Sequence, residues 1–349
     1  MIPETFRAAV LTELGQPLQI IEQVKVPALK PGQVLVRLHY AGLCHSQVME
    51  ARGHRGADPY LPHMLGHEGS GEVLAVGSAV TKVKPGDQVV LGWIRGQGEE
   101  AGGSQYESPI GTINAGGVTT FSELTVASEN RCVPLPAGIP MDLAVLFGCA
   151  LPTGAGMVMN QLKPEPGARV AVLGLGGIGL SALIALQLFS PAQVIAIDAE
   201  PAKLELAKQL GATDTLSAGP EIVEQVRGLT GGLGVDYCLE AAGSAQTIEQ
   251  GFAMVKRGGG LCLFASHPPA EQRISLDPFE LICGKRIQGS WGGASQPDQD
   301  VPRLAELFVR QGFPYQKLLS HSFSLEQINE ALDALERRQL VRALIRISA

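Results

Sequence analysis

The stretch that decides the fold is residues 168–198, ARVAVLGLGGIGLSALIALQLFSPAQVIAID. It begins with a short apolar run typical of a buried strand, passes through a glycine-rich turn into an apolar helix, and ends on a second strand that closes with Asp198. Strand, helix and strand in this order indicate a parallel sheet covered by helices on both faces. The turn consists of Gly174, Leu175, Gly176, Gly177, Ile178 and Gly179.

The spacing G-x-G-x-x-G in this turn is typical of a site for the pyrophosphate of a dinucleotide. Glycines permit the tight turn and let the backbone approach the phosphates, and the helix N-terminus offers free N–H groups and a favourable dipole. Asp198 lies 22 residues after Gly176, at the end of the next strand, where a carboxylate can accept hydrogen bonds from ribose hydroxyls. The alternative is a tight turn beside a solvated Asp198, but strand, turn, helix and acid occur together and favour the dinucleotide.

The residues around Asp198 also predict which dinucleotide binds. A carboxylate at this position repels a 2′-phosphate, and Ala199 and Glu200 supply no compensating cation, so NAD is favoured over NADP. Lys203, one turn into the following helix, can reach the same ribose, or it is an ordinary solvated lysine.

Away from the turn, strands and helices alternate through the middle of the chain, whereas both flanks have a different pattern. Up to about residue 150, glycine and proline interrupt short β-like runs, which predicts an irregular, mostly antiparallel β domain. Residues 296–349 carry two amphipathic helices and a final strand, and we expect them to return to that first domain. We therefore predict a dinucleotide-binding domain over 153–292 and a second domain built from 1–152 and 293–349.

The composition disfavours several classes of protein. The chain has 349 residues, a formal charge of −7 and no cluster of Lys and Arg, so nucleic acid is not an expected partner. The N-terminus lacks a basic region followed by an apolar stretch, and no run of about 18 apolar residues occurs, so we expect neither a signal peptide nor a membrane span. The six cysteines are scattered, which indicates a reducing, cytoplasmic setting rather than a disulfide framework.

Three separate stretches carry candidate metal ligands: Cys44 in AGLCHS, His67 in LGHEGSG and Cys149 in FGCALPTG. Zinc favours thiolate and imidazole, and a catalytic site keeps three protein ligands with one open position. Two thiolates and one neutral imidazole would cancel the formal charge of the ion. Taken singly, each cysteine can also be a buried small hydrophobe and His67 a core histidine.

In combination, the stretches GLCHS, LGHEGSGEV, KPGDQVV, TTFSELTV, GCALPTGAG and GLGGIG resemble the zinc-dependent alcohol dehydrogenases of the medium-chain dehydrogenase/reductase superfamily. The resemblance is collinear over nearly the whole chain. It implies an α/β protein with an irregular β-rich, GroES-like catalytic domain and a doubly wound, parallel-sheet Rossmann domain. It also implies that Cys44, His67 and Cys149 ligate a catalytic zinc.

The resemblance assigns roles to further residues. Ser46 would hydrogen-bond the alcohol and begin proton removal, while Glu68 would sit behind the metal. Trp93 would form an aromatic wall of the substrate pocket. The cofactor contacts it implies are His45 and Arg342 at the pyrophosphate, Thr153 at the nicotinamide, and Asp198 with Lys203 at the ribose.

Three departures from the family pattern stand out. Residues 92–121, where many relatives hold a second zinc with four cysteines, contain no cysteine, so we expect one catalytic zinc and no structural zinc. Gln47 stands where the family usually has Asp, which bears on the surroundings of the metal. Met49 stands where several relatives have the histidine that ends a proton relay.

The function expected is reversible, NAD-linked oxidation of an alcohol to an aldehyde or ketone, with zinc as the Lewis acid. A polyol or sugar dehydrogenase is the nearest alternative, although Cys149 disfavours it. Zinc-free quinone or enoyl reductases lack this Cys/His set, and a non-catalytic NAD-binding protein is a more distant alternative. The resemblance further implies a homo-oligomer, a dimer or a tetramer formed through the cofactor domain. The sequence does not identify the alcohol.

Overall fold

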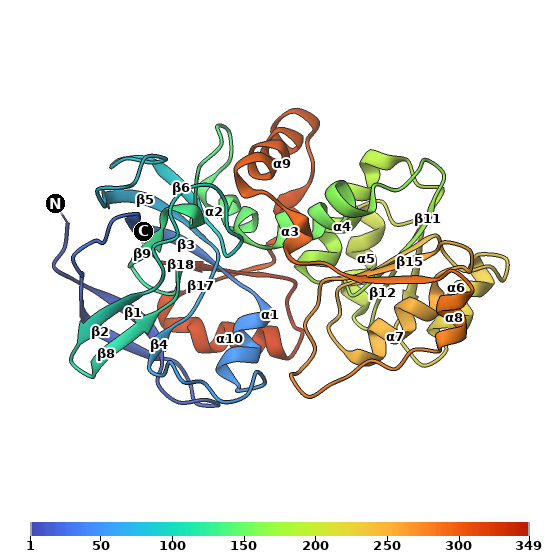
Figure 1. Ribbon diagram of the computed structural model, residues 1–349, viewed down its shortest axis with the longest axis horizontal. Coiled ribbons are helices and arrows are strands. Elements are labelled where there is room, and N and C mark those ends of the chain that lie inside the picture. Colours follow the sequence, from blue (N-terminus) through green and yellow to red (C-terminus); the bar gives the residue numbers. More distant parts are fainter. Residues whose placement is uncertain (1, 348–349) are drawn as a thin grey trace. The chain divides into compact units, whose positions relative to one another are not determined.

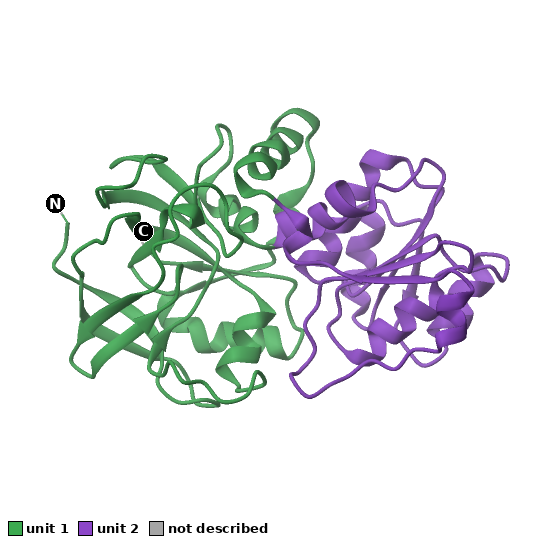
Figure 2. Ribbon diagram, in the orientation of Figure 1, with its two compact units in different colours: residues 1–149, 296–349 green, residues 150–295 purple. Residues whose placement is uncertain are grey.

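The computed structural model describes residues 2–347. The chain divides into two compact units, residues 1–149 with 296–349 and residues 150–295, which Figure 2 shows in green and purple. The sequence places these divisions at 152/153 and 292/293. Within the second unit, Gly293 packs tightly against helix α3 (Ala150–Gly156). A Cβ on Gly293 would lie 2.4 Å from the carbonyl oxygen of Thr153 in that helix. This close packing holds the residues on either side of the expected junctions in one body.

The second unit is built on a six-stranded parallel sheet in the order β13-β12-β11-β14-β15-β16. Its strands are β11 (Arg169–Leu173), β12 (Gln193–Asp198), β13 (Asp214–Ser217), β14 (Tyr237–Glu240), β15 (Leu261–Phe264) and β16 (Arg286–Gly289). Strand order reverses between β11 and β14, and in open parallel sheets ligands bind outside the carboxyl ends of the strands at such a point.

Helices cover both faces of this sheet, as the alternating pattern predicts. In Figure 1, α4 and α5 lie on one face and α6 and α7 on the other. The α-helices are α3 (Ala150–Gly156), α4 (Gly177–Leu186), α5 (Pro201–Gln209), α6 (Ile222–Leu229), α7 (Ala245–Met254) and α8 (Pro278–Ile282). Shorter helical segments are the π-helical Met157–Leu162 and the 3₁₀ turns Gln187–Phe189 and Gly292–Ala294.

The first unit contains two β-sheets, which confirms the irregular β domain. One has the order β2-β1-β4-β8-β7, and the other has the order β10-β6-β5-β3-β18-β17 with β9 also paired to β3. The strands are β1 (Thr5–Leu11), β2 (Gln19–Lys25), β3 (Gln33–Leu43), β4 (His63–Met64), β5 (Gly69–Val76), β6 (Gln88–Leu91), β7 (Ser104–Ser108), β8 (Gly111–Ala115), β9 (Leu124–Ser128), β10 (Cys132–Pro134), β17 (His321–Ser324) and β18 (Ala343–Arg346).

The C-terminal segment returns to this first unit. Strand β18 pairs antiparallel with β3, with Ala343 opposite Leu43, so residues 343–346 are part of the sheet that the first half of the chain begins. The α-helices are α1 (His45–Ala51), α2 (Met141–Ala144), α9 (Pro297–Gln311) and α10 (Ile328–Glu336). The 3₁₀ turns are Glu129–Arg131, Val145–Gly148, Tyr315–Leu318 and Leu325–Gln327.

Between residues 2 and 347, no single helix has the length and apolar composition needed to cross a membrane. The bent pair Met141–Gly148 and Ala150–Leu162 meets that criterion only when its two parts are combined, and nearly all its side chains are buried within the protein. A buried core helix in a globular protein passes the same test.

Candidate metal centre and cofactor turn

Antiparallel pairing of β3 with β5 brings the first two candidate ligands together. Because Ala41 near the end of β3 lies opposite Gly69 at the start of β5, the residue after β3 and the residues before β5 meet at one end of the sheet. Cys44 lies directly after β3 and caps α1, while His67 lies two residues before β5. The backbone N–H of Gly42 donates to the carbonyl of Glu68 at 3.1 Å and extends this pairing toward the ligands.

Close backbone packing brings the third ligand, Cys149, to the same place. A Cβ on Gly148 would lie 2.2 Å from the carbonyl oxygen of Leu91 and 2.9 Å from Cβ of Glu68. A Cβ on Gly92 would in turn lie 2.8 Å from the carbonyl oxygen of Gly148. Only glycine fits at these two positions, and the contact places the residue after Gly148 beside the His67 loop.

The three side chains form a compact ligand set. Nε2 of His67 lies 3.3 Å from Sγ of Cys149, and the ligand atoms of Cys44, His67 and Cys149 all lie within 4.8 Å of one another. Tetrahedral zinc, with bonds of about 2.3 Å to sulfur and about 2.0 Å to nitrogen, sets neighbouring ligand atoms roughly 3.5–3.8 Å apart. The set therefore fits one zinc ion with a fourth position left for substrate.

The protonation of the two thiols prepares this site for a cation. The pKa of Cys44 is held well below its usual value, first by its hydrogen bond with Cys149 and then by His67 and Arg342, although burial opposes the shift. The same hydrogen bond and burial raise the pKa of Cys149. Cys44 is therefore the readier of the two thiols to ionise, and metal binding would displace the protons that the pair still holds.

Glu68 and Arg342 form a buried ion pair behind the ligands. Glu68 is fully buried and Arg342 is 4% exposed, and the guanidinium Nη2 donates to Oε1 of Glu68. The Glu68 carboxyl lies over Gly42, where a Cβ would stand 2.6 Å from its Oε1. Among the described atoms, Oε2 of Glu68 and Nε of Arg342 have no hydrogen-bond partner. The structure thus places Arg342 at Glu68, and its expected contact with a pyrophosphate stays a prediction.

Three more residues at the start of α1 surround the ligand set. His45 is exposed, Ser46 is half-buried and Gln47 is buried. The Oγ atom of Ser46 is buried and has no hydrogen-bond partner within residues 2–347. A buried hydroxyl without a partner is costly unless a ligand satisfies it. Gln47 contacts two of the three candidate ligands. Its Oε1 accepts from the N–H of Cys44 at 3.1 Å, and its Nε2 contacts Nδ1 of His67.

In the second unit, the glycines of the turn have three different reasons to be glycine. Gly174 adopts φ +92°, and a Cβ there would lie 2.5 Å from the backbone of Ala242. A Cβ on Gly179 would lie 1.9 Å from the carbonyl oxygen of Gly174, so close helix–strand packing requires it. Gly176, the N-cap of α4, has an ordinary φ of −78° and nothing within 4 Å of a Cβ. The open space at Gly176 fits a phosphate approaching the N-terminus of α4.

The acid at the end of β12 lies beside this turn. Oδ2 of Asp198 accepts from the N–H of Leu175 at 2.7 Å, and Oδ1 accepts from the N–H of Glu200 at 3.0 Å. Lys203, half-buried in the first turn of α5, follows it. Thr153 in α3 is 3% exposed, and its Oγ1 is a second buried hydroxyl for which the described residues offer no partner.

Comparison with known proteins gives this geometry a context. The alcohol dehydrogenase GroES-like domain family matches residues 30–137, and the zinc-binding dehydrogenase family matches residues 177–310. The S-(hydroxymethyl)glutathione dehydrogenase of Synechocystis sp. is 33% identical, over 97% of this chain and 99% of that protein. The protein belongs to the zinc-dependent alcohol dehydrogenases. The class-3 alcohol dehydrogenase of Cereibacter sphaeroides is 31% identical over the same shares of both chains.

Solved structures of other alcohol dehydrogenases have the same fold. The benzyl alcohol dehydrogenase of Acinetobacter calcoaceticus is 27% identical, with a TM-score of 0.87 over 99% of this chain and 100% of that one. An alcohol dehydrogenase zinc-binding domain protein from Burkholderia ambifaria is 29% identical, with a TM-score of 0.88 over 99% of both chains. The predicted combination of a GroES-like domain and a Rossmann domain in a zinc-dependent alcohol oxidoreductase is confirmed.

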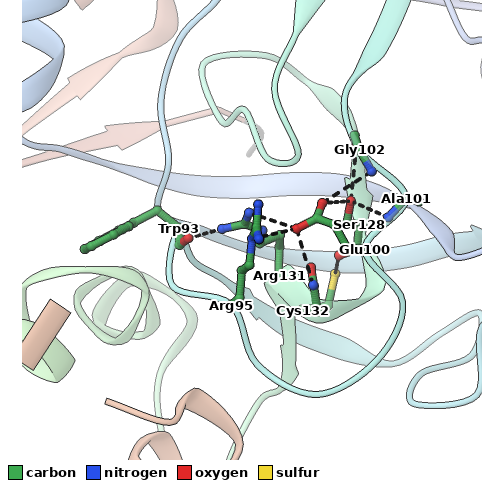
Figure 3. Close-up of polar contacts among 9 residues, drawn as sticks. Trp93, Arg95, Glu100, Ala101, Gly102, Ser128, Arg131 and Cys132 are labelled. Atoms are coloured by element: carbon green, nitrogen blue, oxygen red, sulfur yellow. Dashed lines mark hydrogen bonds and ion pairs between the residues drawn. The ribbon is translucent and has the colours of Figure 1, made fainter. Parts of the chain in front are cut away.

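This alcohol dehydrogenase holds its cysteine-free lobe with carboxylates. Oε2 of Glu100 contacts Nε of Arg95 at 2.8 Å and Nη2 of Arg131 at 3.2 Å, and Oε1 accepts from Oγ of Ser128 at 3.2 Å (Figure 3). Arg131 reaches further, because its Nη1 donates to the carbonyl oxygen of Trp93. Figure 3 shows the indole of Trp93 extending away from this network while its carbonyl faces Arg131.

A second carboxylate, Glu129, anchors the backbone of the lobe. It is 1% exposed; Oε1 accepts the N–H groups of Thr81 and Lys82 at 2.6 and 2.8 Å, and Oε2 accepts that of Glu99 at 2.8 Å. Gly98, at φ +101°, lets the chain turn against it.

The network of Glu100, Glu129 and Arg131 was not predicted from the sequence. The partners of Glu129 lie 30 to 48 residues away along the chain, and Arg131 lies 31 residues from Glu100, so no local pattern marks these contacts. The only signal in the sequence is the pair of acids Glu99-Glu100 within a lobe that lacks cysteine.

Proposed function

We propose that this zinc-dependent alcohol oxidoreductase uses NAD and one catalytic zinc to interconvert a small alcohol and its aldehyde or ketone. The observation that carries the proposal is the convergence of Cys44, His67 and Cys149 within 4.8 Å. The open space at Gly176 and the carboxylate of Asp198 support the dinucleotide part.

Zinc, when bound, supplies the Lewis acid that lowers the pKa of the alcohol, and NAD accepts the hydride. Cys44, His67 and Cys149 would hold the metal. Ser46 would accept the substrate hydroxyl proton at Oγ, which is buried and lacks a partner among the described residues. Glu68 would sit behind the metal, held there by its ion pair with Arg342.

The cofactor would be held by the glycine turn, by Asp198 and Lys203 after it, and by a few residues outside the turn. The turn Gly174–Gly179 would receive the pyrophosphate at the N-terminus of α4, with His45 and Arg342 as further contacts. Asp198 and Lys203 would bind the adenosine ribose, and the carboxylate would disfavour NADP. Thr153 would lie against the nicotinamide.

The proton exit differs from that of relatives with a relay histidine. Met49 has no titratable group, so a proton accepted by Ser46 would leave through a ribose hydroxyl of the cofactor to water. Alcohol oxidation would therefore be slow near pH 6–7 and rise with pH as hydroxide becomes the acceptor.

The substrate side of the proposal rests on Trp93, whose indole would form one wall of the pocket. A polyol or sugar dehydrogenase is the second candidate, and the thiol of Cys149 at the third ligand position disfavours it. Because relatives are named for S-(hydroxymethyl)glutathione and benzyl alcohol, these two compounds belong in a substrate panel with simple alcohols and a polyol.

The protein would act as a homo-oligomer in a reducing compartment. The second unit exposes Phe279, Leu281 and Ile282 on α8, at 57%, 43% and 80%, a few residues before the edge strand β16 in the chain. Exposed apolar side chains and a strand with one unpaired edge are both common at subunit interfaces. All six cysteines are free thiols, in keeping with the cytoplasm.

One experiment tests the centre of this proposal. Purified protein should contain about one zinc per chain and form NADH with at least one alcohol of the panel. Cys149→Ala should lose most of the zinc and the activity, while Cys132→Ala, which removes an equally buried thiol away from the ligand set, should keep both. Two zinc ions per chain would contradict the single site, and full activity of Cys149→Ala would contradict the ligand assignment.

A further inference from the structure

The side chain of Gln47 stands between two of the groups that would hold the metal. It is 2% exposed, and its amide contacts the backbone N–H of Cys44 through Oε1 and the imidazole of His67 through Nε2. A glutamine amide has one acceptor oxygen and one NH₂ donor. Its hydrogen bonds therefore depend on which nitrogen of His67 carries the proton.

A neutral histidine that binds a metal through Nε2 carries its proton on Nδ1, and it normally donates that proton to a carboxylate, carbonyl or water. In this protein Nδ1 faces Gln47. The single oxygen of Gln47 would then face two donors, the N–H of Cys44 and the Nδ1–H of His67. Turning the amide over exchanges the two donors but still satisfies only one of them.

The other tautomer gives each of these three contacts one donor and one acceptor. With the proton on Nε2, His67 donates to Sγ of Cys149, which lies 3.3 Å away. Nδ1 then accepts from the amide of Gln47, whose oxygen stays with Cys44. This arrangement occupies the nitrogen that zinc needs.

We propose that Gln47 is a positioning residue that favours the Nε2–H tautomer of His67, and that it thereby weakens zinc binding and makes the metal exchangeable. The inference rests on the proposed ligand set. A glutamate at position 47 has the same shape with two acceptor oxygens, one for Cys44 and one for Nδ1–H, so it removes the conflict that glutamine creates.

The test compares zinc affinity and the histidine tautomer in the full-length protein. Competition with a chelator of known zinc affinity is measured for wild type, Gln47→Glu and Gln47→Leu, with the exposed Gln16→Glu as a control for added charge. We expect Gln47→Glu to bind zinc about 10–100-fold more tightly, which is the usual effect of a carboxylate partner on a ligand histidine. Gln47→Leu supplies no acceptor and should not bind more tightly than wild type.

The tautomer gives a readout that does not depend on activity. In the metal-free proteins, ¹⁵N shifts of His67, assigned with a His67→Asn variant, should show the proton on Nε2 in wild type and on Nδ1 in Gln47→Glu. Equal zinc affinities of wild type and Gln47→Glu, a gain in Gln47→Leu as large as in Gln47→Glu, or a wild-type proton on Nδ1 would each overturn the inference. Absence of zinc binding in all variants would overturn the ligand assignment as well.

Discussion

Replacing Glu129 by Gln tests how the cysteine-free lobe is held. Oε1 of Glu129 accepts the N–H groups of Thr81 and Lys82, and Oε2 accepts that of Glu99. A glutamine has one oxygen, which should stay with the two N–H groups of Thr81 and Lys82. Its NH₂ group would then face the N–H of Glu99, a donor facing a donor.

The expected cost is about 3 kcal/mol. Losing one hydrogen bond to a charged acceptor lowers the free energy of unfolding by roughly 1.5–3 kcal/mol. The two remaining bonds also weaken, because charge-assisted bonds are about twice as strong as neutral ones. Water reaching the exposed backbone near Glu99 offsets part of this loss.

Chemical denaturation gives the total, and amide hydrogen exchange gives the location. Protection of the Glu99 amide should fall in Glu129→Gln, while protection at Lys82 should change much less. The exposed Glu13→Gln, which removes the same charge at the surface, serves as the control. If the Glu99 amide stays as protected as in wild type, or if Glu13→Gln destabilises the protein equally, the assignment of Glu129 as the anchor is wrong.

The effect of Glu129 should depend on pH. Burial raises the pKa of Glu129, but the N–H groups of Glu99, Thr81 and Lys82 outweigh burial and hold it below the usual value. A depressed pKa in the folded state means that the stabilisation is complete above the usual glutamate pKa of about 4.3 and is lost as pH falls through the lower folded-state pKa. The difference in stability between wild type and Glu129→Gln should therefore shrink below about pH 4.

Four further predictions concern the site and the core. Asp198→Gly should raise kcat/KM for NADP relative to NAD, and an unchanged ratio would place Asp198 away from the ribose. Met49→His should raise the rates of alcohol oxidation and proton release more at pH 6.5 than at pH 9, as measured by stopped flow with a pH indicator. Equal rates of proton release by wild type and Met49→His at pH 6.5 would show that the absent relay has no kinetic effect. Gly42→Ala puts a Cβ 2.6 Å from the Glu68 carboxyl, so it should cost about 1–3 kcal/mol in urea denaturation and lower kcat, whereas unchanged values would mean that Glu68 moves freely. Tyr106→Phe removes the buried hydroxyl that accepts the N–H of Val126 at 2.8 Å, and it should cost about 1–3 kcal/mol in the same assay unless water replaces it.

The sequence predicts the second unit well because its signals are local. A strand, a glycine turn, a helix and Asp198 follow one another within 31 residues, and each has its own periodicity or composition. The side-by-side placement of Cys44, His67 and Cys149 was expected only through resemblance to a family. It depends on the register of β3 with β5 and on the contact of Gly148 with Leu91, and neither is written in a local pattern.

Contacts between distant polar side chains could not be predicted. The sequence marked Gln47 as a departure from the family, but only the structure shows that its amide touches both Cys44 and His67. The hydrogen bond from Arg131 to the carbonyl of Trp93 could not be predicted either. It follows from the pairing of β10 with β6 and not from the residue types. Long side chains choose among many partners, and tertiary geometry decides between them.

The carboxylate-held lobe changes which stresses can damage this enzyme. Residues 92–121 offer no thiol for peroxide to oxidise, and the anchors Glu100 and Glu129 bind backbone and guanidinium groups that a chelator cannot remove. A cell short of zinc could therefore leave the lobe intact while the catalytic centre goes unfilled, and later restore activity by metal uptake alone. The corresponding weakness is acid, because protonating either carboxylate removes acceptors that the lobe has no metal to replace.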